Sequence, residues 1–121
     1  MASFIQKELL NKHGITYNNS GDYIWNKTTD AGGNSVGDVA RATAFDTLGN
    51  IYTTGEINDI ELVNHYRTEK YNSSGSLIWN RIYNGSYSGT DTGAYDIAVF
   101  NDSDIYVTGL VNNNWSTIKY N

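Results

Sequence analysis

The sequence predicts an all-β fold made of short antiparallel strands, and three observations support this. The chain of 121 residues has no proline and ten tyrosines, and aromatic residues are enriched in strands. Only 39% of its residues are hydrophobic, and Asn, Ser, Thr and Gly, which favour tight turns, separate the apolar runs. The chain also repeats itself, which predicts stacked small units in place of one ordinary core.

The repeat is seen when the chain is compared with itself. The segment that starts at Tyr17 recurs from Tyr71, and the tryptophans within it, Trp25 and Trp79, are 79 − 25 = 54 positions apart. After a longer connection in the first copy, the displacement falls to 119 − 70 = 49, so a loop holds an insertion of five residues. Surface loops tolerate such insertions. Further pairs 54 positions apart are Ala40 and Ala94, Ala44 and Ala98, and Tyr52 and Tyr106.

This register divides the chain into an N-terminal segment, residues 1–16, and two repeats, residues 17–70 and 71–121. Within the first segment, Ser3 to His13 fits a short helix, with Ser3 as N-cap and Gly14 as terminator. A second interpretation stays open. Residues 8–11 read Glu-Leu-Leu-Asn, which resembles the Glu-Leu-Val-Asn of residues 61–64 and would make the segment a strand.

The strands follow from alternating apolar runs between turn residues. A single strand of the tryptophan type is expected at Tyr23 to Lys27, then four strands from Ala40 to Ile82, then three from Ala94 to Asn121. The turns are expected at residues 73–76, 101–104 and 112–114, which are rich in Asn, Asp, Ser and Gly. The last unit therefore lacks its outer strand.

Small residues on the first strand of each unit indicate close packing. By the two-residue period, Ala40, Ala42 and Ala44 share one face, and Ala94 and Ala98 do so in the second copy. Four strands joined by tight turns, with a repeat of about 50 residues, are typical of a β-propeller blade, whose innermost strand has little room. A flat sandwich with repeating strands is the alternative.

The sequence resembles a known family at these positions. The run from Lys70 to Asn80, the glycine-rich stretch after it, residues 94–99 and residues 104–109 resemble the SBBP β-propeller repeat of bacteria and archaea. The likeness covers residues 17–121. It implies a propeller blade found mostly in cell-surface or secreted proteins, without a fixed reaction or ligand. Such repeats occur in longer arrays.

Two blades leave apolar faces uncovered, so self-assembly is expected. The strand around Trp25 could complete the C-terminal blade of another copy by strand exchange. A head-to-tail contact closes into a ring or grows as a filament. Three chains giving six blades is the first expectation, four giving eight the second, and a filament the third.

Charge and composition exclude several functions. The net charge of −5 and the scattered basic residues argue against nucleic acid as a partner. No apolar run is long enough for membrane insertion, and no cysteine is present for a disulfide or a thiolate site. The first residues show no basic stretch before an apolar one, so no secretory signal is expected there. No cofactor is expected.

Candidate chemistry is sparse. His13 and His65 have no third ligand at metal spacing. Asn101, Asp102 and Asp104 could offer oxygens to calcium, but they more readily form a hairpin turn. A carboxylate set in the inserted loop is what glycoside hydrolysis would need, although a solvated loop is the simpler interpretation. These residues are Glu56, Asp59 and Glu61.

Aromatic residues give the remaining candidates. Trp25 and Trp79 are expected to pack between blades, together with Tyr52, Tyr106 and the alanines. A ligand platform for a glycan or peptide could be formed near the loop of residues 84–93. Its members would be Tyr83, Tyr87, Tyr95 and Trp115.

The sequence therefore predicts a non-enzymatic structural or interaction module that binds copies of itself. Its place would be extracellular or at a cell surface, if it derives from a secreted parent. A lectin-like binder is the first alternative, and a glycoside hydrolase the second.

Overall fold

In the computed structural model, the described residues are 4–7, 13–17, 20–28, 38–58, 63–84 and 92–121. They form ten strands and no helix, so the all-β prediction is confirmed. All paired strands are antiparallel. The strands are β1 (Phe4–Lys7), β2 (His13–Tyr17), β3 (Tyr23–Thr28), β4 (Val39–Phe45), β5 (Ile51–Asn58), β6 (Asn64–Tyr71), β7 (Leu77–Asn84), β8 (Gly93–Phe100), β9 (Asp104–Val111) and β10 (Asn114–Tyr120).

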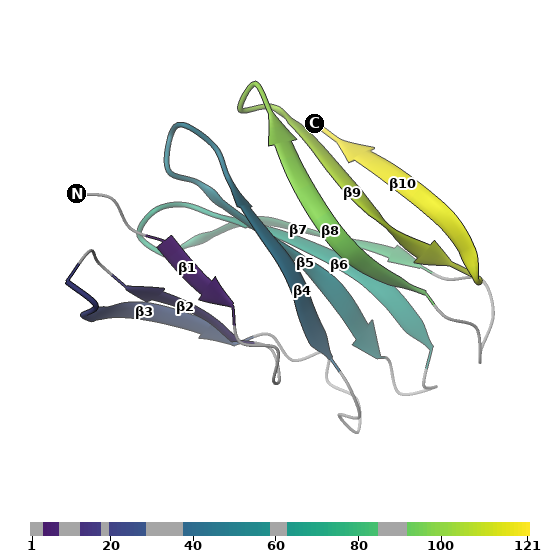
Figure 1. Ribbon diagram of the computed structural model, residues 1–121, viewed down its shortest axis with the longest axis horizontal. Coiled ribbons are helices and arrows are strands. Elements are labelled where there is room, and N and C mark those ends of the chain that lie inside the picture. Colours follow the sequence, from purple (N-terminus) through teal and green to yellow (C-terminus); the bar gives the residue numbers. More distant parts are fainter. Residues whose placement is uncertain (1–3, 8–12, 18–19, 29–37, 59–62, 85–91) are drawn as a thin grey trace.

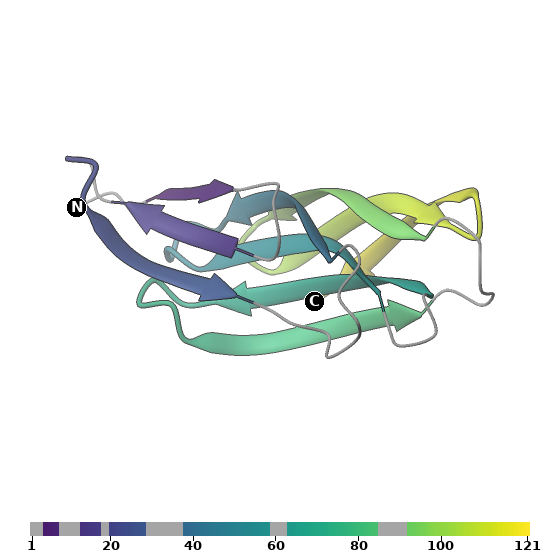
Figure 2. The same ribbon diagram turned by 90° about the horizontal axis from the view of Figure 1, so that it is seen from below.

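The strands form three sheets, ordered β1-β2-β3, β4-β5-β6-β7 and β8-β9-β10. The predicted four-stranded and three-stranded units are therefore confirmed. The β4–β7 sheet lies between the other two (Figure 1). Seen from below, the purple N-terminal strands and the yellow C-terminal strands lie toward opposite ends of the molecule (Figure 2).

The predicted N-terminal helix is wrong, and the alternative of a strand is confirmed for Phe4–Lys7 and His13–Tyr17. The capping signal at Ser3 is local, whereas β1 pairs with β2 and β2 pairs with β3. This pairing satisfies backbone groups on one edge of β1 and β3 and on both edges of β2. Residues 8–12 lie outside the described part. The strand at Trp25 is thus the edge of a third sheet.

The turns form as their residues dictate. Asn72 closes the β6–β7 turn, because its side-chain oxygen accepts bonds from the backbone N–H groups of Ser74 (3.1 Å) and Ser76 (2.9 Å). Gly75 takes a φ of 83° there, which glycine adopts without strain. The β8–β9 and β9–β10 turns contain residues in the left-handed backbone region, which Asn and Asp tolerate. These residues are Asn101, Asp102, Asn112 and Asn113.

A β-bulge interrupts the first strand of the β4–β7 sheet, between Ala40 and Ala42, and the first strand of the β8–β10 sheet, between Ala94 and Asp96. The bulge breaks the two-residue period, so the prediction that the alanines share one face is wrong. Ala94 is fully buried and Ala98 is exposed. Ala42 and Ala44 pack at the edge of the core, while Ala40 is half-buried on the other side of the bulge.

The bulge also brings two backbones close together. A Cβ on Gly55 would lie 1.9 Å from the carbonyl oxygen of Val39, and one on Gly109 would lie 2.1 Å from that of Gly93. Only glycine allows this approach. Gly55 and Gly109 are 109 − 55 = 54 positions apart, so both sheets use the same device at equivalent positions.

The buried core lies mainly between the β4–β7 and β8–β10 sheets. Strand β8 contacts both β4 and β5. On β9, Ile105 and Val107 point into this core and are almost fully buried. The residues that alternate with them therefore face away from the β4–β7 sheet. The core cluster is Tyr52, Tyr66, Ala94, Ile97, Ile105 and Val107.

Candidate functional site

The two places where sheets stack use the same aromatic contact. Trp25 of β3 packs against Tyr71 of β6, with ring centroids 6.2 Å apart and planes at 40°. Trp79 of β7 packs against Tyr120 of β10 at 6.1 Å and 40°. The two tryptophans are 54 positions apart, and the two tyrosines are 120 − 71 = 49 positions apart, as the repeat predicts. Both tryptophans are half-buried between sheets, which agrees with the packing role expected of them.

Within the sheets, equivalent residues also make equivalent contacts. The Lys70 ammonium lies 5.0 Å from the ring centre of Tyr52, and that of Lys119 lies 5.6 Å from the ring centre of Tyr106. Buried Asp38 accepts a bond from the N–H of Asn58 at 2.9 Å. In the next sheet, Thr92 and Asn112 repeat this bond at 3.1 Å. The β4–β7 and β8–β10 sheets are therefore built on one local plan.

In the part of the chain that the structure describes, one face of the β8–β10 sheet is uncovered. On β10, Ile118 and Tyr120 pack toward the core, so Trp115, Thr117 and Lys119 point the other way. This second face, which we call the outer face, contains Tyr106, Thr108, Trp115, Thr117 and Lys119.

The β4–β7 sheet shows what happens to such a face when it is covered. Tyr66 corresponds to Trp115, since 115 − 66 = 49. Tyr66 is 0% exposed beneath the β8–β10 sheet, whereas Trp115 is 84% exposed. Thr68 is 0% exposed, and its counterpart Thr117 is exposed. An exposed aromatic patch on a repeating sheet is typical of an interaction surface.

The outer edge of β10 is the second uncovered feature. In the β4–β7 sheet, the corresponding strand β6 pairs with β7 from His65 to Tyr71. In the part of the chain that the structure describes, β10 pairs only with β9. Its outer edge therefore presents unpaired backbone N–H and C=O groups, which can template another strand.

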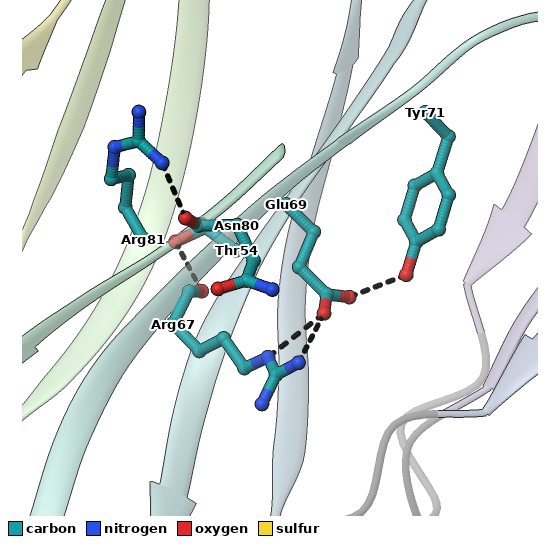
Figure 3. A network of polar contacts seen from close by, with 6 residues as sticks. All are labelled: Thr54, Arg67, Glu69, Tyr71, Asn80 and Arg81. Carbon is teal, nitrogen blue, oxygen red and sulfur yellow. Dashed lines mark hydrogen bonds and ion pairs between the residues drawn. The ribbon is translucent and has the colours of Figure 1, made fainter. Parts of the chain in front are cut away.

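The two stacking interfaces differ in polarity. Toward the β1–β3 sheet, β6 presents buried Glu69, whose carboxylate accepts bonds from Arg67 Nε (2.8 Å) and from the Tyr71 hydroxyl (2.5 Å) (Figure 3). At the same positions β10 has Ser116, Ile118 and Tyr120. β6 thus presents a charged network to one interface, whereas β10 presents mainly apolar side chains to the other. Such networks fix one arrangement when every member is satisfied.

A polar clamp joins the β4–β5 turn to the β8–β9 turn. Asp102 accepts bonds from the backbone N–H of Thr47 (2.7 Å) and from its hydroxyl. Asp104 pairs with Lys119 at 3.0 Å. Both carboxylates thus have partners, as the interpretation of this segment as a hairpin turn expects. The structure shows no group of three His, Cys, Asp or Glu suited to a metal among its described residues.

Asp46 organises the β4–β5 turn. Its carboxylate accepts bonds from the N–H of Asn50 (2.8 Å) and from the buried Tyr52 hydroxyl (3.1 Å). Burial acts to raise the pKa of Asp46, but the bonds from Asn50 and Tyr52, together with nearby Lys70, outweigh it and hold that pKa below its ordinary value. Sequence reasoning missed this residue, because Phe100 stands at the equivalent position.

The predicted aromatic platform is split between two places. Trp115 is on the outer face, whereas Tyr83 lies on β7 beside Tyr66, with ring centroids 6.1 Å apart. Tyr95 lies in the β8 bulge, 5.7 Å from the guanidinium of Arg41 in the equivalent bulge of β4. Tyr87 lies outside the described residues.

Tyr66 was not among the predicted site residues, yet it has an unusual environment. Its side chain is buried, and its hydroxyl has no hydrogen-bond partner in the described part of the chain. Burial raises the pKa of Tyr66 to about 12, with smaller contributions from Tyr95, Tyr120 and Tyr83. A strand pattern can predict that a tyrosine is buried, but it cannot show whether the hydroxyl is bonded.

The predicted carboxylate set is only partly described. Glu56 is not in a loop but near the end of β5, where Arg41 binds its carboxylate at 2.5 Å. Asp59 and Glu61 lie outside the described residues. Of the expected histidines, His65 lies in β6 opposite Asn84.

No helix in the described part has the length and apolar character needed to cross a membrane. Comparison of the chain with known protein families and with curated proteins finds no match.

Proposed function

We propose that the chain is a non-enzymatic β-propeller module that assembles head-to-tail with copies of itself. The observation that carries this proposal is the contrast between Tyr66, 0% exposed, and Trp115, 84% exposed, at equivalent positions of successive sheets. Burial of an aromatic side chain contributes about 2 kcal/mol, so covering the outer face is favourable. A repeat protein meets this need with another repeat.

The partner that fits the outer face is a second copy, because the chain already shows how one of its sheets covers the next. The contacts of Trp25 with Tyr71 and of Trp79 with Tyr120 support a common stacking geometry. In this proposal, the β1–β3 sheet of one copy covers the outer face of another. Such a heterologous contact closes into a ring when its rotation allows.

The number of copies depends on the sheets in each chain. The expectation of three copies rested on two blades per chain, whereas the structure has three sheets. Two copies then supply 2 × 3 = 6 sheets, a usual number for a propeller. We therefore propose a closed two-copy ring of 2 × 13.5 = 27 kDa. Use as a scaffold displayed at a cell surface, as the SBBP resemblance implies, belongs to the same proposal.

Light scattering across concentrations tests this proposal. We expect the wild-type mass to rise from one chain to two, and Trp115→Asp to remain a single chain while it folds normally. Leu48→Asp is the matched control, because Leu48 is 76% exposed in the β4–β5 turn, away from the outer face. A wild-type protein that stays at one chain at every concentration would refute self-assembly.

A glycan-binding role is the second candidate, and the exposed tyrosines around Tyr66 favour it. Tyr83 and Tyr95 are 44% and 47% exposed and lie near Tyr66. Sugars bind to exposed aromatic faces of this kind. Glycan arrays probed with the wild type and with Tyr83→Ala test it, and no glycan bound by the wild type would reject it.

A further inference from the structure

The outer edge of β10 has a structural template within the same chain. At the equivalent edge, β7 pairs antiparallel with β6, and Trp79 lies opposite Lys70. The Trp79 ring packs edge-on against Tyr52, with centroids 6.2 Å apart. The side chains that receive Trp79 are thus Tyr52 and Lys70, on the face that the next sheet covers.

The β8–β10 sheet keeps the equivalents of these two receiving residues. Tyr106 and Lys119 contact each other as Tyr52 and Lys70 do. In the described part of the chain, no aromatic ring packs beside Tyr106 as Trp79 packs beside Tyr52. The receiving pair is therefore present beside an unpaired edge, while the strand and its tryptophan are missing.

We propose that the outer edge of β10 binds an extended segment of a second polypeptide, antiparallel to β10, with a tryptophan opposite Lys119 and against Tyr106. The segment has the chemistry of β7, in which two aliphatic residues, Leu77 and Ile78, precede the tryptophan. The inference rests on the equivalence of successive sheets used in the proposed function. It does not require that the chain binds copies of itself.

Two sources of affinity and one of specificity follow from this geometry. The unpaired N–H and C=O groups of β10 supply main-chain hydrogen bonds, as in other strand additions. The tryptophan contributes an aromatic contact with Tyr106. The register is selected because only one alignment places the tryptophan opposite Lys119.

The two tryptophan strands of the same chain, β3 and β7, are held in other sheets and do not pair with β10. β7 is paired with β6, and β3 is paired with β2. Trp25 is moreover held on the β6–β7 turn, where its Nε1 donates to the Ser73 carbonyl oxygen at 3.3 Å. The donor segment is therefore expected to come from another polypeptide.

The test uses a fluorescein-labelled peptide with the sequence of residues 75–84 and the full chain at a concentration where light scattering shows single chains. Fluorescence anisotropy should show saturable binding. The same peptide with Trp79→Ala, and the full chain with Tyr106→Ala, should each bind about tenfold more weakly, since the aromatic contact and its buried area together contribute on the order of one tenfold step.

Two further peptides separate strand addition from nonspecific hydrophobic binding. One is N-methylated at Trp79 and the other at Asn80, so that adjacent N–H groups, which point to opposite sides of a strand, are blocked in turn. Strand addition predicts that one peptide loses binding and the other keeps it. Equal binding by both, or no saturable binding of the parent peptide, would overturn the inference.

The outcome is distinguishable from that of the proposed function. Peptide binding by a chain that never self-associates supports the edge site and refutes the ring. Self-association without peptide binding by single chains supports the ring and refutes the edge site.

Discussion

Two buried tyrosines allow a matched test of whether buried hydroxyl groups in the core are hydrogen-bonded. Tyr52 and Tyr66 are both 0% exposed. The Tyr52 hydroxyl donates to Asp46 at 3.1 Å, whereas the Tyr66 hydroxyl has no partner in the described part of the chain. A buried hydroxyl without a partner costs about 1–3 kcal/mol, and a satisfied one contributes about 1 kcal/mol.

Phenylalanine removes each hydroxyl and keeps the ring. We therefore expect Tyr66→Phe to raise the free energy of unfolding by about 1 kcal/mol and Tyr52→Phe to lower it by about 1 kcal/mol. In a chain of this size the corresponding changes in melting temperature are about 4 °C in opposite directions. The ring contact between Tyr66 and Tyr83 is unchanged by the substitution.

Urea unfolding followed by tryptophan fluorescence measures both variants, at one protein concentration and with the slope m compared to exclude a change in the unfolded state. If Tyr66→Phe is destabilised as much as Tyr52→Phe, the Tyr66 hydroxyl has a partner in the folded protein. The assignment of an unsatisfied group would then be refuted.

Three further predictions follow from the same contacts. Gly109→Ala should lower the free energy of unfolding by several kcal/mol, about 3, because the new Cβ would meet the Gly93 carbonyl oxygen at 2.1 Å; thermal unfolding measures this, and a loss below about 1 kcal/mol would contradict the close approach. Asp46 has a lowered folded pKa, so its stabilisation is present above its unfolded pKa and is lost as pH falls through the folded value; the difference between the wild type and Asp46→Asn should shrink in acid, and a constant difference down to pH 2 would argue against it. Tyr66 has a folded pKa of about 12, raised from 10.0, so stability should fall between these two pH values; Tyr66→Phe should reduce that loss in alkaline urea titrations, and an identical loss would count against the raised pKa.

Periodic features of the fold could be predicted from the sequence. The displacement of 54 between Trp25 and Trp79 and the turn residues around Gly75 located the four-stranded and three-stranded sheets. These signals are local, and strand pairing in the structure agrees with them. The prediction of packing for both tryptophans followed from the same displacement.

The features that the sequence could not reveal depend on contacts between distant residues. The capping signals at Ser3 suggested a helix, but pairing with β2 determines the conformation of Phe4–Lys7. The bulge at Ala94 depends on the close approach of Gly109, which strand alternation does not encode.

The candidate site shows the same limit. Tyr83 and Tyr95 flank the loop of residues 84–93, and Trp115 follows the turn at residues 112–114. Alternation on β10 nevertheless places Trp115 on the outer face. The contact of Tyr83 with Tyr66 crosses from one strand to its neighbour. Which aromatic residues meet is therefore decided by sheet register, which the sequence alone leaves open.

The most direct test of the account asks whether the outer face of the β8–β10 sheet becomes buried when chains meet. The chain has no cysteine, so Thr117→Cys places a unique thiol on that face, and Ser103→Cys places one in the exposed β8–β9 turn as a control. We expect maleimide labelling of the thiol at position 117 to slow as protein concentration rises, while labelling at position 103 stays constant. Equal labelling rates at both positions, at every concentration, would contradict the claim that this face binds a second copy.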